Sequence, residues 1–314
     1  MNIGIVGNGL VGSTAAYAII MRGLGRKIVL VDKDKKRSLA ETNDLLHAIS
    51  FANPLTVRQG NYEDLADCKL VVIAAGVSQK KGESRLDLLK RNADVFAKVI
   101  PAILTVAPES ILVIATNPLD VMTYTATRFA ADSGVPTTRV LGTGTMLDTA
   151  RFRSLLGAVL DIDPQHVNGY VVGEHGDSEV LTWSLATVGA MGLEDFCKQR
   201  SIIFDEDLKR RVDDGVRNAA YSIIDGKGAT YYGIGSAIAK IVDVILHDQR
   251  SILTVSTMTS LTGDLADVSI SLPNVVGGNG ILETLPLPLN TEESAELKRS
   301  AEILKTEIEK INLN

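Results

Sequence analysis

The sequence has few of the residues that build disulfide-stabilised, metal-binding or nucleic-acid-binding proteins. Its 314 residues include only two cysteines and four histidines, and 32 basic residues stand against 38 acidic ones. Cys68 and Cys197 lack CxxC spacing and a histidine cluster, so they predict buried or partly buried free thiols and no metal site. The net charge of −6, without a concentrated basic stretch, argues against a nucleic-acid or membrane partner.

Long apolar runs are also absent. No run approaches the roughly 18 residues of a transmembrane helix, and MNIGIVGNGL begins with an apolar strand pattern in place of a basic signal segment. A cytoplasmic protein is therefore the expectation. The composition is ordinary for a globular protein, 45% hydrophobic and 22% charged, and the length suggests two domains.

Short Val/Ile-rich runs alternate with helical patterns through the first half of the chain. The apolar runs are NIGIV, KIVLVD, LVVIAA, ILVIATN and RVLG. Continuous apolar strands separated by helices are typical of a parallel sheet that is buried on both faces. The pattern predicts a doubly wound α/β domain over residues 1–145.

From about residue 146 the pattern changes. Helices are expected in LDTARFRSLLGAVL, near 204–225, at 232–247 and in TEESAELKRSAEILKTEIEKI; strands are expected in VNGYVV, EVLTWS, ILTVSTMT, ADVSISLPNVVG and GILETLPLPL. These segments predict a second, mixed α+β domain over 146–314, with the 232–247 helix packing back against the first domain. Because no long linker separates the halves, we expect them to share a cleft.

A glycine motif lies between the first strand and the first helix. GNGLVG supplies Gly7, Gly9 and Gly12 as G-x-G-x-x-G, and Asp32 ends the next strand 20 residues after Gly12. The first glycine allows a tight turn, the second lets the backbone approach a pyrophosphate, and the third lets the helix pack against the strand. The acid accepts hydrogen bonds from ribose hydroxyls and repels a 2′-phosphate, so the segment predicts NAD; turn glycines without a ligand are the alternative.

Two further features bear on the same site. Lys33, Lys35 and Lys36 could in principle receive a 2′-phosphate, but a solvated helix start explains them better. Asn117, in TNP, follows the apolar strand ILVIAT at the carboxyl edge of the predicted sheet, where such folds bind ligands. A turn-forming asparagine before proline is the alternative interpretation.

One histidine lies in a glycine-flanked loop between carboxylates. GEHGD contains His175, and histidine titrates near neutrality, as a proton donor to a ketone must. A buried aspartate on the other ring nitrogen would fix the tautomer; Asp148 is the first candidate, and Asp177 or Glu174 are weaker ones. The remaining histidines lack a comparable setting and are expected to be ordinary surface or partly buried residues: His47, His166 and His247.

LDTARFR places Arg151 three residues after Asp148 on a predicted helix, so both side chains project from one face. A surface ion pair without function is the alternative. Arginine supplies the planar, always charged, bidentate group that an anionic substrate needs. The segment therefore predicts a clamp for a substrate carboxylate.

Several segments together resemble one family. GNGLVG, VLVD, AAGVSQKKGESRLDLLKRN, ATNPLD, LDTARFR, GEHGD and KGATYYGIG occur in the order and approximate spacing of the L-lactate and malate dehydrogenase family. The resemblance covers essentially the whole chain. It implies a Rossmann-type NAD domain and hydride transfer to a 2-oxo acid. Members of the family assemble as tetramers or dimers, and we expect a homotetramer here. The resemblance also implies roles for four residues: His175 as proton donor and acceptor, Asp148 as its partner, Arg151 as the carboxylate clamp and Asn117 near the reacting carbonyl.

The resemblance also assigns a mobile loop. The segment from Gly76 to about Leu88 corresponds to the family's loop, whose closure brings Arg85 over the substrate to polarise the carbonyl and exclude water. Gly76 is expected to contact the cofactor. Without the resemblance, KKGESR would be interpreted as an exposed charged turn.

Two positions resemble the lactate enzymes of the family. Gln79 stands where malate enzymes have an arginine, which would pair with the second carboxylate of oxaloacetate but stay unpaired beside the methyl group of pyruvate. Thr230, in KGATYYG, stands where lactate enzymes have a threonine. Pyruvate and L-lactate are therefore expected; the alternatives are a malate or broad 2-hydroxy acid dehydrogenase and, remotely, a non-catalytic NAD-binding protein.

One position departs from the family's regulated members. Relatives that respond to fructose 1,6-bisphosphate pair an arginine with a histidine at a subunit interface. Arg153 matches the arginine, but Asn168 stands where the histidine is expected, seven residues before His175. Because an amide carries no positive charge, we expect weak or absent activation by this effector.

Overall fold

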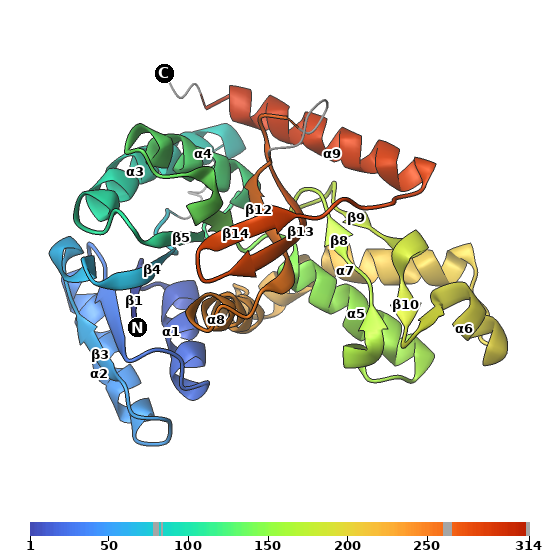
Figure 1. The fold of residues 1–314 in the computed structure, drawn as a ribbon, viewed down its shortest axis with the longest axis horizontal. Helices are drawn as coiled ribbons and strands as arrows, with labels where there is room; N and C mark the ends of the chain where they lie inside the picture. The colour runs from blue at the N-terminus through green and yellow to red at the C-terminus, as the bar shows by residue number, and fades with distance from the viewer. Residues whose placement is uncertain (78–81, 83, 260–265, 312–314) are drawn as a thin grey trace.

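The structure is a computed structural model that describes residues 1–77, 82, 84–259 and 266–311. Among these residues a nine-stranded sheet runs in the order β14-β13-β12-β6-β5-β4-β1-β2-β3. Figure 1 shows this sheet with helices packed on it, and α5, α6 and α7 gathered beside two small sheets at the other end of the molecule. The fold is α/β with a Rossmann-type arrangement, which confirms the predicted class.

In the first half of the chain, the described residues form six parallel strands and four α-helices. The strands are β1 (Asn2–Val6), β2 (Lys27–Val31), β3 (Thr56–Gln59), β4 (Cys68–Ile73), β5 (Ile111–Ile114) and β6 (Val140–Gly142). The helices are α1 (Leu10–Met21), α2 (Lys35–Ile49), α3 (Arg85–Val106) and α4 (Leu119–Asp132). Strand order 3-2-1-4-5-6 is the doubly wound topology, in which the carboxyl edge of the sheet binds ligands.

The second half contributes helices and shorter strands. Its helices are α5 (Met146–Leu160), α6 (Leu193–Gln199), α7 (Glu206–Lys227), α8 (Tyr232–Leu246) and α9 (Thr291–Glu309). Its strands are β7 (Val167–Asn168), β8 (Val171–Val172), β9 (Val180–Leu181), β10 (Thr187–Val188), β11 (Met191–Gly192), β12 (Ser251–Met258), β13 (Ser269–Gly277) and β14 (Gly280–Thr284). The segment VNGYVV, expected as one strand, is divided between β7 and β8, which belong to different small sheets.

The last three strands extend the central sheet in antiparallel fashion. Ser256 of β12 pairs with Gly142 of β6, and β13 and β14 follow outward. The sheet therefore crosses from the first half of the chain into the second, which the division into two halves by sequence pattern did not anticipate.

Helices cover both faces of the sheet. Strand β4 illustrates the alternation: Val71 and Ile73 pack in the cluster with α3 and α4, whereas Leu70 and Val72 pack in the cluster with α1 and α8. Helix α8 thus shares a buried core with β1 and α1 although it lies more than 200 residues later in the chain. A third cluster joins α5, α6 and α7 around Phe152.

Helix ends follow their capping residues. Asp205 accepts a hydrogen bond from the Leu208 N–H at the start of α7, and Gly228, at φ +84°, ends that helix in the left-handed conformation. These caps place α7 two residues later than the range expected from its apolar pattern. At α9, the side chains of Asn290 and Glu293 form a reciprocal capping box.

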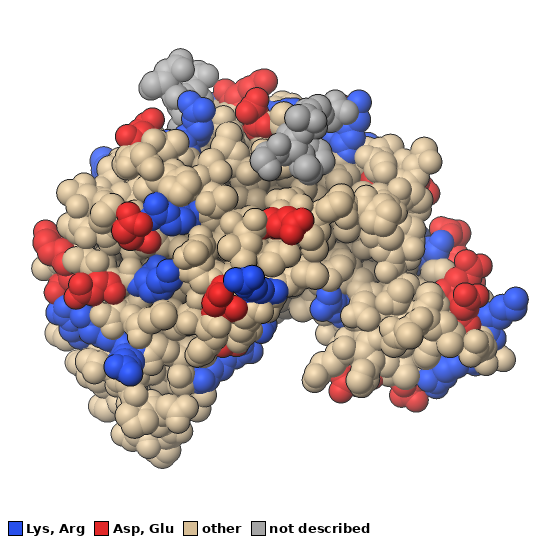
Figure 2. Space-filling model, viewed as in Figure 1, with Lys and Arg blue, Asp and Glu red and all other residues tan. Residues whose placement is uncertain are grey.

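The distribution of surface charge and the burial of the two thiols agree with what the composition predicts. In Figure 2, Lys and Arg are interspersed with Asp and Glu on the face shown, without a large area of one sign. Cys68 and Cys197 are free and buried, and burial raises the pKa of Cys68 to about 11. Within the described ranges, no helix combines the length and apolar character needed to cross a bilayer.

Candidate active site

The glycine motif joins β1 to α1 by a turn that excludes side chains at two positions. Gly7 has φ +97°, and a Cβ there would lie 2.4 Å from the Ala75 backbone nitrogen. A Cβ on Gly12 would lie 1.9 Å from the Gly7 carbonyl oxygen. A Cβ on Gly9, by contrast, meets no atom within 4 Å, and Gly9 caps α1 without a side-chain hydrogen bond. Gly9 thus leaves open space at the start of α1, where the free N–H groups of a helix end suit a pyrophosphate.

Asp32 lies beside this turn at the end of β2. Its Oδ2 accepts a hydrogen bond from the Asn8 N–H (2.6 Å) and its Oδ1 accepts one from the Asp34 N–H (2.9 Å). Asn8 is buried and accepts a hydrogen bond from the Ser38 hydroxyl, while its Nδ2 has no partner among the described residues. The half-buried carboxylate beside an open glycine turn has the donor and acceptor chemistry that the ribose and pyrophosphate of NAD need.

Asn92 connects two loops at the carboxyl edge of the sheet. Its Oδ1 accepts a hydrogen bond from the Val77 N–H (2.8 Å), and its Nδ2 donates to the carbonyl of Asn117 (3.2 Å). A Cβ on Gly76 would lie 2.8 Å from Thr116 Cγ2, so the loops after β4 and β5 approach closely. Asn117 is exposed and is followed by a cis peptide bond to proline. Asn92 was not among the residues expected from the sequence.

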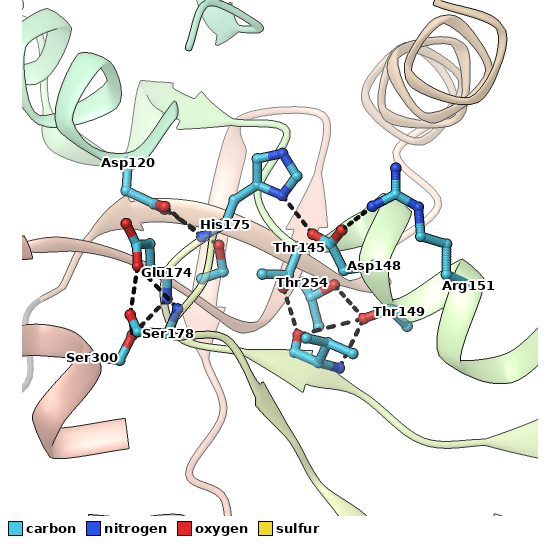
Figure 3. A network of polar contacts seen from close by, with 12 residues as sticks. Asp120, Thr145, Asp148, Thr149, Arg151, Glu174, His175, Ser178, Thr254 and Ser300 are labelled. Carbon is cyan, nitrogen blue, oxygen red and sulfur yellow. Dashed lines mark hydrogen bonds and ion pairs between the residues drawn. The ribbon is translucent and has the colours of Figure 1, made fainter. Parts of the chain in front are cut away.

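His175, Asp148 and Arg151 lie together (Figure 3). His175 Nδ1 is 2.5 Å from Asp148 Oδ2, and Arg151 Nη1 donates to Asp148 Oδ1 at 2.7 Å. The exposed fractions of the three side chains are 25%, 3% and 15% respectively. Asp148 and Arg151 come from adjacent turns of α5, so one buried carboxylate holds both the imidazole and the guanidinium.

The charges around His175 favour its protonated form. Burial opposes the imidazolium, but the charge and hydrogen bond of Asp148, together with the charges of Asp120 and Glu179, raise the pKa of His175 to about 9. Burial also opposes the Asp148 carboxylate, yet His175 and Arg151 hold the pKa of Asp148 below its usual range. At neutral pH the pair is therefore an imidazolium bonded to a carboxylate.

Three consecutive backbone N–H groups fix the histidine loop to three separate elements. The N–H groups of Gly173, Glu174 and His175 donate to the Ser271 carbonyl on β13 (2.9 Å), the Ser300 hydroxyl on α9 (2.8 Å) and Asp120 Oδ2 on α4 (2.7 Å). Asp120 is buried, and that burial raises its pKa to about 6. Its place in ATNPLD gave no indication of this contact, because the partner lies 55 residues away.

The weaker candidates for orienting His175 face elsewhere. The Glu174 carboxylate accepts hydrogen bonds from the N–H and hydroxyl of Ser178, and Asp177 accepts one from the Tyr221 hydroxyl (3.0 Å). A second His–Asp contact, His247 Nδ1 to Asp243 Oδ1 at 2.8 Å, was missed by the sequence analysis. It lies at the exposed end of α8, with 58% of the His247 side chain accessible.

Of three positions assigned by resemblance, two are not fully described. Gln79 lies outside the described residues. Arg85 begins α3 after the cap residue Ser84, but its side chain lies outside the described part of the chain. Thr230 is half-buried in the connection between α7 and α8.

The two effector-site candidates lie in different settings. Arg153 Nε donates to the Gly169 carbonyl (3.0 Å), and its guanidinium lies 5.2 Å from the centre of the Tyr170 ring. Asn168 is exposed in β7. Arg153 is therefore already engaged with the strand segment that follows Asn168.

Comparison with known proteins identifies the family. Residues 1–142 match the model of the lactate/malate dehydrogenase NAD binding domain, and residues 145–313 match that of the lactate/malate dehydrogenase alpha/beta C-terminal domain. The chain is 53% identical to an L-lactate dehydrogenase of Geotalea daltonii over 100% of both chains, and 53% identical to one of Thermus aquaticus over 97% of both.

Solved structures agree with the sequence relatives. A lactate dehydrogenase from a Medee basin deep-sea metagenome library superimposes with a TM-score of 0.95 at 40% identity, covering 99% of this chain and 98% of that one. The minor L-lactate dehydrogenase of Enterococcus mundtii, in a ligand-bound form, gives a TM-score of 0.94 at 37% identity, covering 100% and 99%. The chain belongs to the lactate/malate dehydrogenase family.

Proposed function

We propose that the chain is an NAD-dependent L-lactate dehydrogenase that interconverts pyruvate and L-lactate. The observation that carries the proposal is the contact of His175 with buried Asp148, beside Arg151, within a chain whose full-length relatives are L-lactate dehydrogenases. The arrangement supplies a proton donor and a carboxylate-binding cation in one place.

His175 is the proposed proton donor and acceptor. Because Nδ1 faces Asp148, Nε2 is the nitrogen that gives its proton to the carbonyl oxygen of pyruvate. In the oxidising direction the neutral ring takes the hydroxyl proton of L-lactate. Asp148 keeps the ring in one tautomer and stabilises the imidazolium.

Arg151 is the proposed clamp for the substrate carboxylate. Its guanidinium has five donors, of which one contacts Asp148, so four remain and two of these can make a bidentate contact. Asn117 is proposed to bind the reacting carbonyl region and Arg85 to polarise it when the loop from Gly76 closes. Gln79 and Thr230 are proposed to line the pocket for the methyl group.

Bound NADH supplies the hydride and NAD accepts it. The proposed binding groups are the glycine turn, Asp32 for the ribose hydroxyls, and the edge formed by Gly76 and Asn117. In this proposal residues 1–145 hold the dinucleotide and 146–314 supply the acid–base pair and the clamp. We further propose a cytoplasmic homotetramer with weak or absent response to fructose 1,6-bisphosphate, because Asn168 is neutral.

The test is kcat/KM for pyruvate and for oxaloacetate with NADH, followed by nicotinamide absorbance. A preference for pyruvate of about a hundredfold, or 2.7 kcal/mol in transition-state binding, is expected. A preference for oxaloacetate would replace the proposal with a malate dehydrogenase. NADH binding without turnover on any 2-oxo acid would identify a non-catalytic protein.

A further inference from the structure

Glu179 is a buried carboxyl group outside the set of residues used above. It lies one residue before β9, only 4% of its surface is exposed, and its backbone N–H donates to the Gly176 carbonyl at 3.2 Å. That hydrogen bond folds the chain back onto the histidine loop. Glu179 Oε1 is buried and has no hydrogen-bond partner among the described residues. An unpartnered carboxylate in this position would be costly to bury, whereas a neutral acid would cost much less.

Charged groups from several elements act on Glu179. The charges of Asp148 and Arg151 on α5, of Arg217 on α7 and of His175 in the adjacent loop act on its carboxyl group. On α9, Glu296 acts on Arg217. Glu179 is therefore part of the same charge cluster as the proton donor.

Arg217 is the cation on α7 that could neutralise Glu179, but its described hydrogen bonds go elsewhere. Its Nε donates to Asp213 Oδ2 at 2.6 Å and its Nη1 donates to the Asp177 carbonyl at 2.8 Å. These contacts tie α7 to the histidine loop. They leave Glu179 without the paired geometry that normally stabilises a buried anion.

Burial is the main cause of the raised pKa of Glu179. Together with the charge of Asp148, it raises the pKa of Glu179 to about 8, although Arg217, His175 and Arg151 act in the opposite direction. The charge of Glu179 in turn raises the pKa of His175. Ionisation of Glu179 and retention of the proton on His175 are therefore linked.

We propose that Glu179 is a positioning residue for proton transfer: an uncharged carboxylic acid buried beside the histidine loop, whose ionisation would hold the proton on His175. The proposal rests on the proposed function, in which His175 is the proton donor. Its consequence is a pyruvate-reducing activity that extends further into the alkaline range than the His175–Asp148 contact alone would allow.

The test compares Glu179→Gln with the control Glu174→Gln. Gln has the shape of the neutral acid. Glu174 directly precedes His175, but its carboxylate accepts hydrogen bonds from Ser178. The protonation of His175 is measured by the pH dependence of its modification by diethyl pyrocarbonate, which attacks neutral imidazole, with the modified peptide quantified by mass spectrometry. This readout requires no turnover.

We expect the midpoint for His175 to fall by about 0.5–1 pH unit in Glu179→Gln and to stay unchanged in Glu174→Gln. The alkaline limb of kcat/KM for pyruvate should move by the same amount. Equal midpoints in wild type and Glu179→Gln would overturn the proposal. If the wild type reduces no 2-oxo acid, the proposed function fails, while the modification midpoint still decides the role of Glu179.

Stability gives a second readout. An acid whose pKa is raised on folding destabilises the folded chain as pH rises above its ordinary pKa, so Glu179→Gln should melt a few degrees higher than wild type near pH 7.5 and equally at pH 4. A variant that melts lower near pH 7.5, or fails to fold, would show an ionised, paired Glu179 and overturn the proposal.

Discussion

Asp148 Oδ2 lies 2.5 Å from His175 Nδ1, and the opposite oxygen of the same carboxylate holds Arg151. The proposed proton donor and the proposed carboxylate clamp thus share one buried anion. A substrate carboxylate that binds Arg151 partly neutralises its positive charge. The negative charge of Asp148 is then less compensated and stabilises the imidazolium of His175 more strongly. Substrate binding and protonation of His175 should therefore reinforce one another.

Replacement of the histidine tests the acid–base role. His175→Asn is expected to lower kcat for pyruvate reduction by about 10²–10⁴-fold, because the amide cannot donate a proton to the carbonyl oxygen. NADH binding, measured by fluorescence titration, should change little. His166→Asn, at an exposed position, is the matched control and should retain full activity. Equal turnover in the two variants would remove His175 from the mechanism.

The raised pKa of His175 predicts opposite pH profiles in the two directions. His175 remains protonated up to about pH 9, so kcat/KM for pyruvate should be flat at neutral pH and fall above about 9. Lactate oxidation needs the neutral ring and should rise toward the same pH. Asp148→Asn removes the charge that raises the pKa, so both limbs should move to lower pH by at least about one unit.

The same shift affects stability, with a defined sign. Because the pKa of His175 is raised on folding from 6.5 to about 9, its stabilising contribution is complete below pH 6.5 and is lost as pH rises through 9. Chemical denaturation of wild type and His175→Asn across this range measures the difference. A gap between the two proteins that widens with increasing pH would contradict the assignment.

Asp32 should set the preference for NADH over NADPH. Asp32→Ala removes the charge that repels a 2′-phosphate and the acceptor for the N–H groups of Asn8 and Asp34. The ratio of kcat/KM for NADH to that for NADPH is expected to fall at least about tenfold. Asp44→Ala, exposed on α2, should leave the ratio unchanged.

Gln79 should set the preference for pyruvate over oxaloacetate. Gln79→Arg is expected to lower kcat/KM for pyruvate and to raise it for oxaloacetate, each by at least about tenfold, because the new cation has a partner only in the second carboxylate. The same substitution at Gln199, at the exposed end of α6, controls for added charge. An unchanged ratio in Gln79→Arg would place selectivity elsewhere.

Fructose 1,6-bisphosphate should have little or no effect on the wild type. The KM for pyruvate and the sedimentation coefficient are expected to change little or not at all, because Asn168 is neutral and Arg153 is engaged with the Gly169 carbonyl and the Tyr170 ring. Asn168→His adds a titratable cation and should bring a measurable response near pH 6, where imidazole is charged. A clear fall in the wild-type KM with effector would contradict this argument.

The parallel sheet could be predicted because its buried strands are continuous apolar runs. The edge strand β3 escaped detection because TVRQ is short and half polar, as edge strands often are. The join between β6 and β12 could not be predicted, since the pairing of Ser256 with Gly142 depends on tertiary contacts more than 100 residues apart.

The residues of the site likewise divide into those that the sequence could predict and those that it could not. The spacing of Asp148 and Arg151 on a helix, and the glycines around His175, were local signals. Asp120, Asn92 and Glu179 gave none, because each is defined by burial and by partners in other segments. His247 shows the converse, since its contact with Asp243 joins residues one helical turn apart, yet 58% of the histidine side chain is exposed.

The pairing of β12 with β6 has a consequence for how the chain folds. Either half expressed alone would present an unpaired strand edge at this position. The hydrophobic residues of α1 and α8 would also lose their packing contacts with each other. The boundary between residues 142 and 145, where one family model ends and the next begins, therefore does not separate two cooperative units. On heating, the dinucleotide turn and the histidine loop should be lost in a single transition.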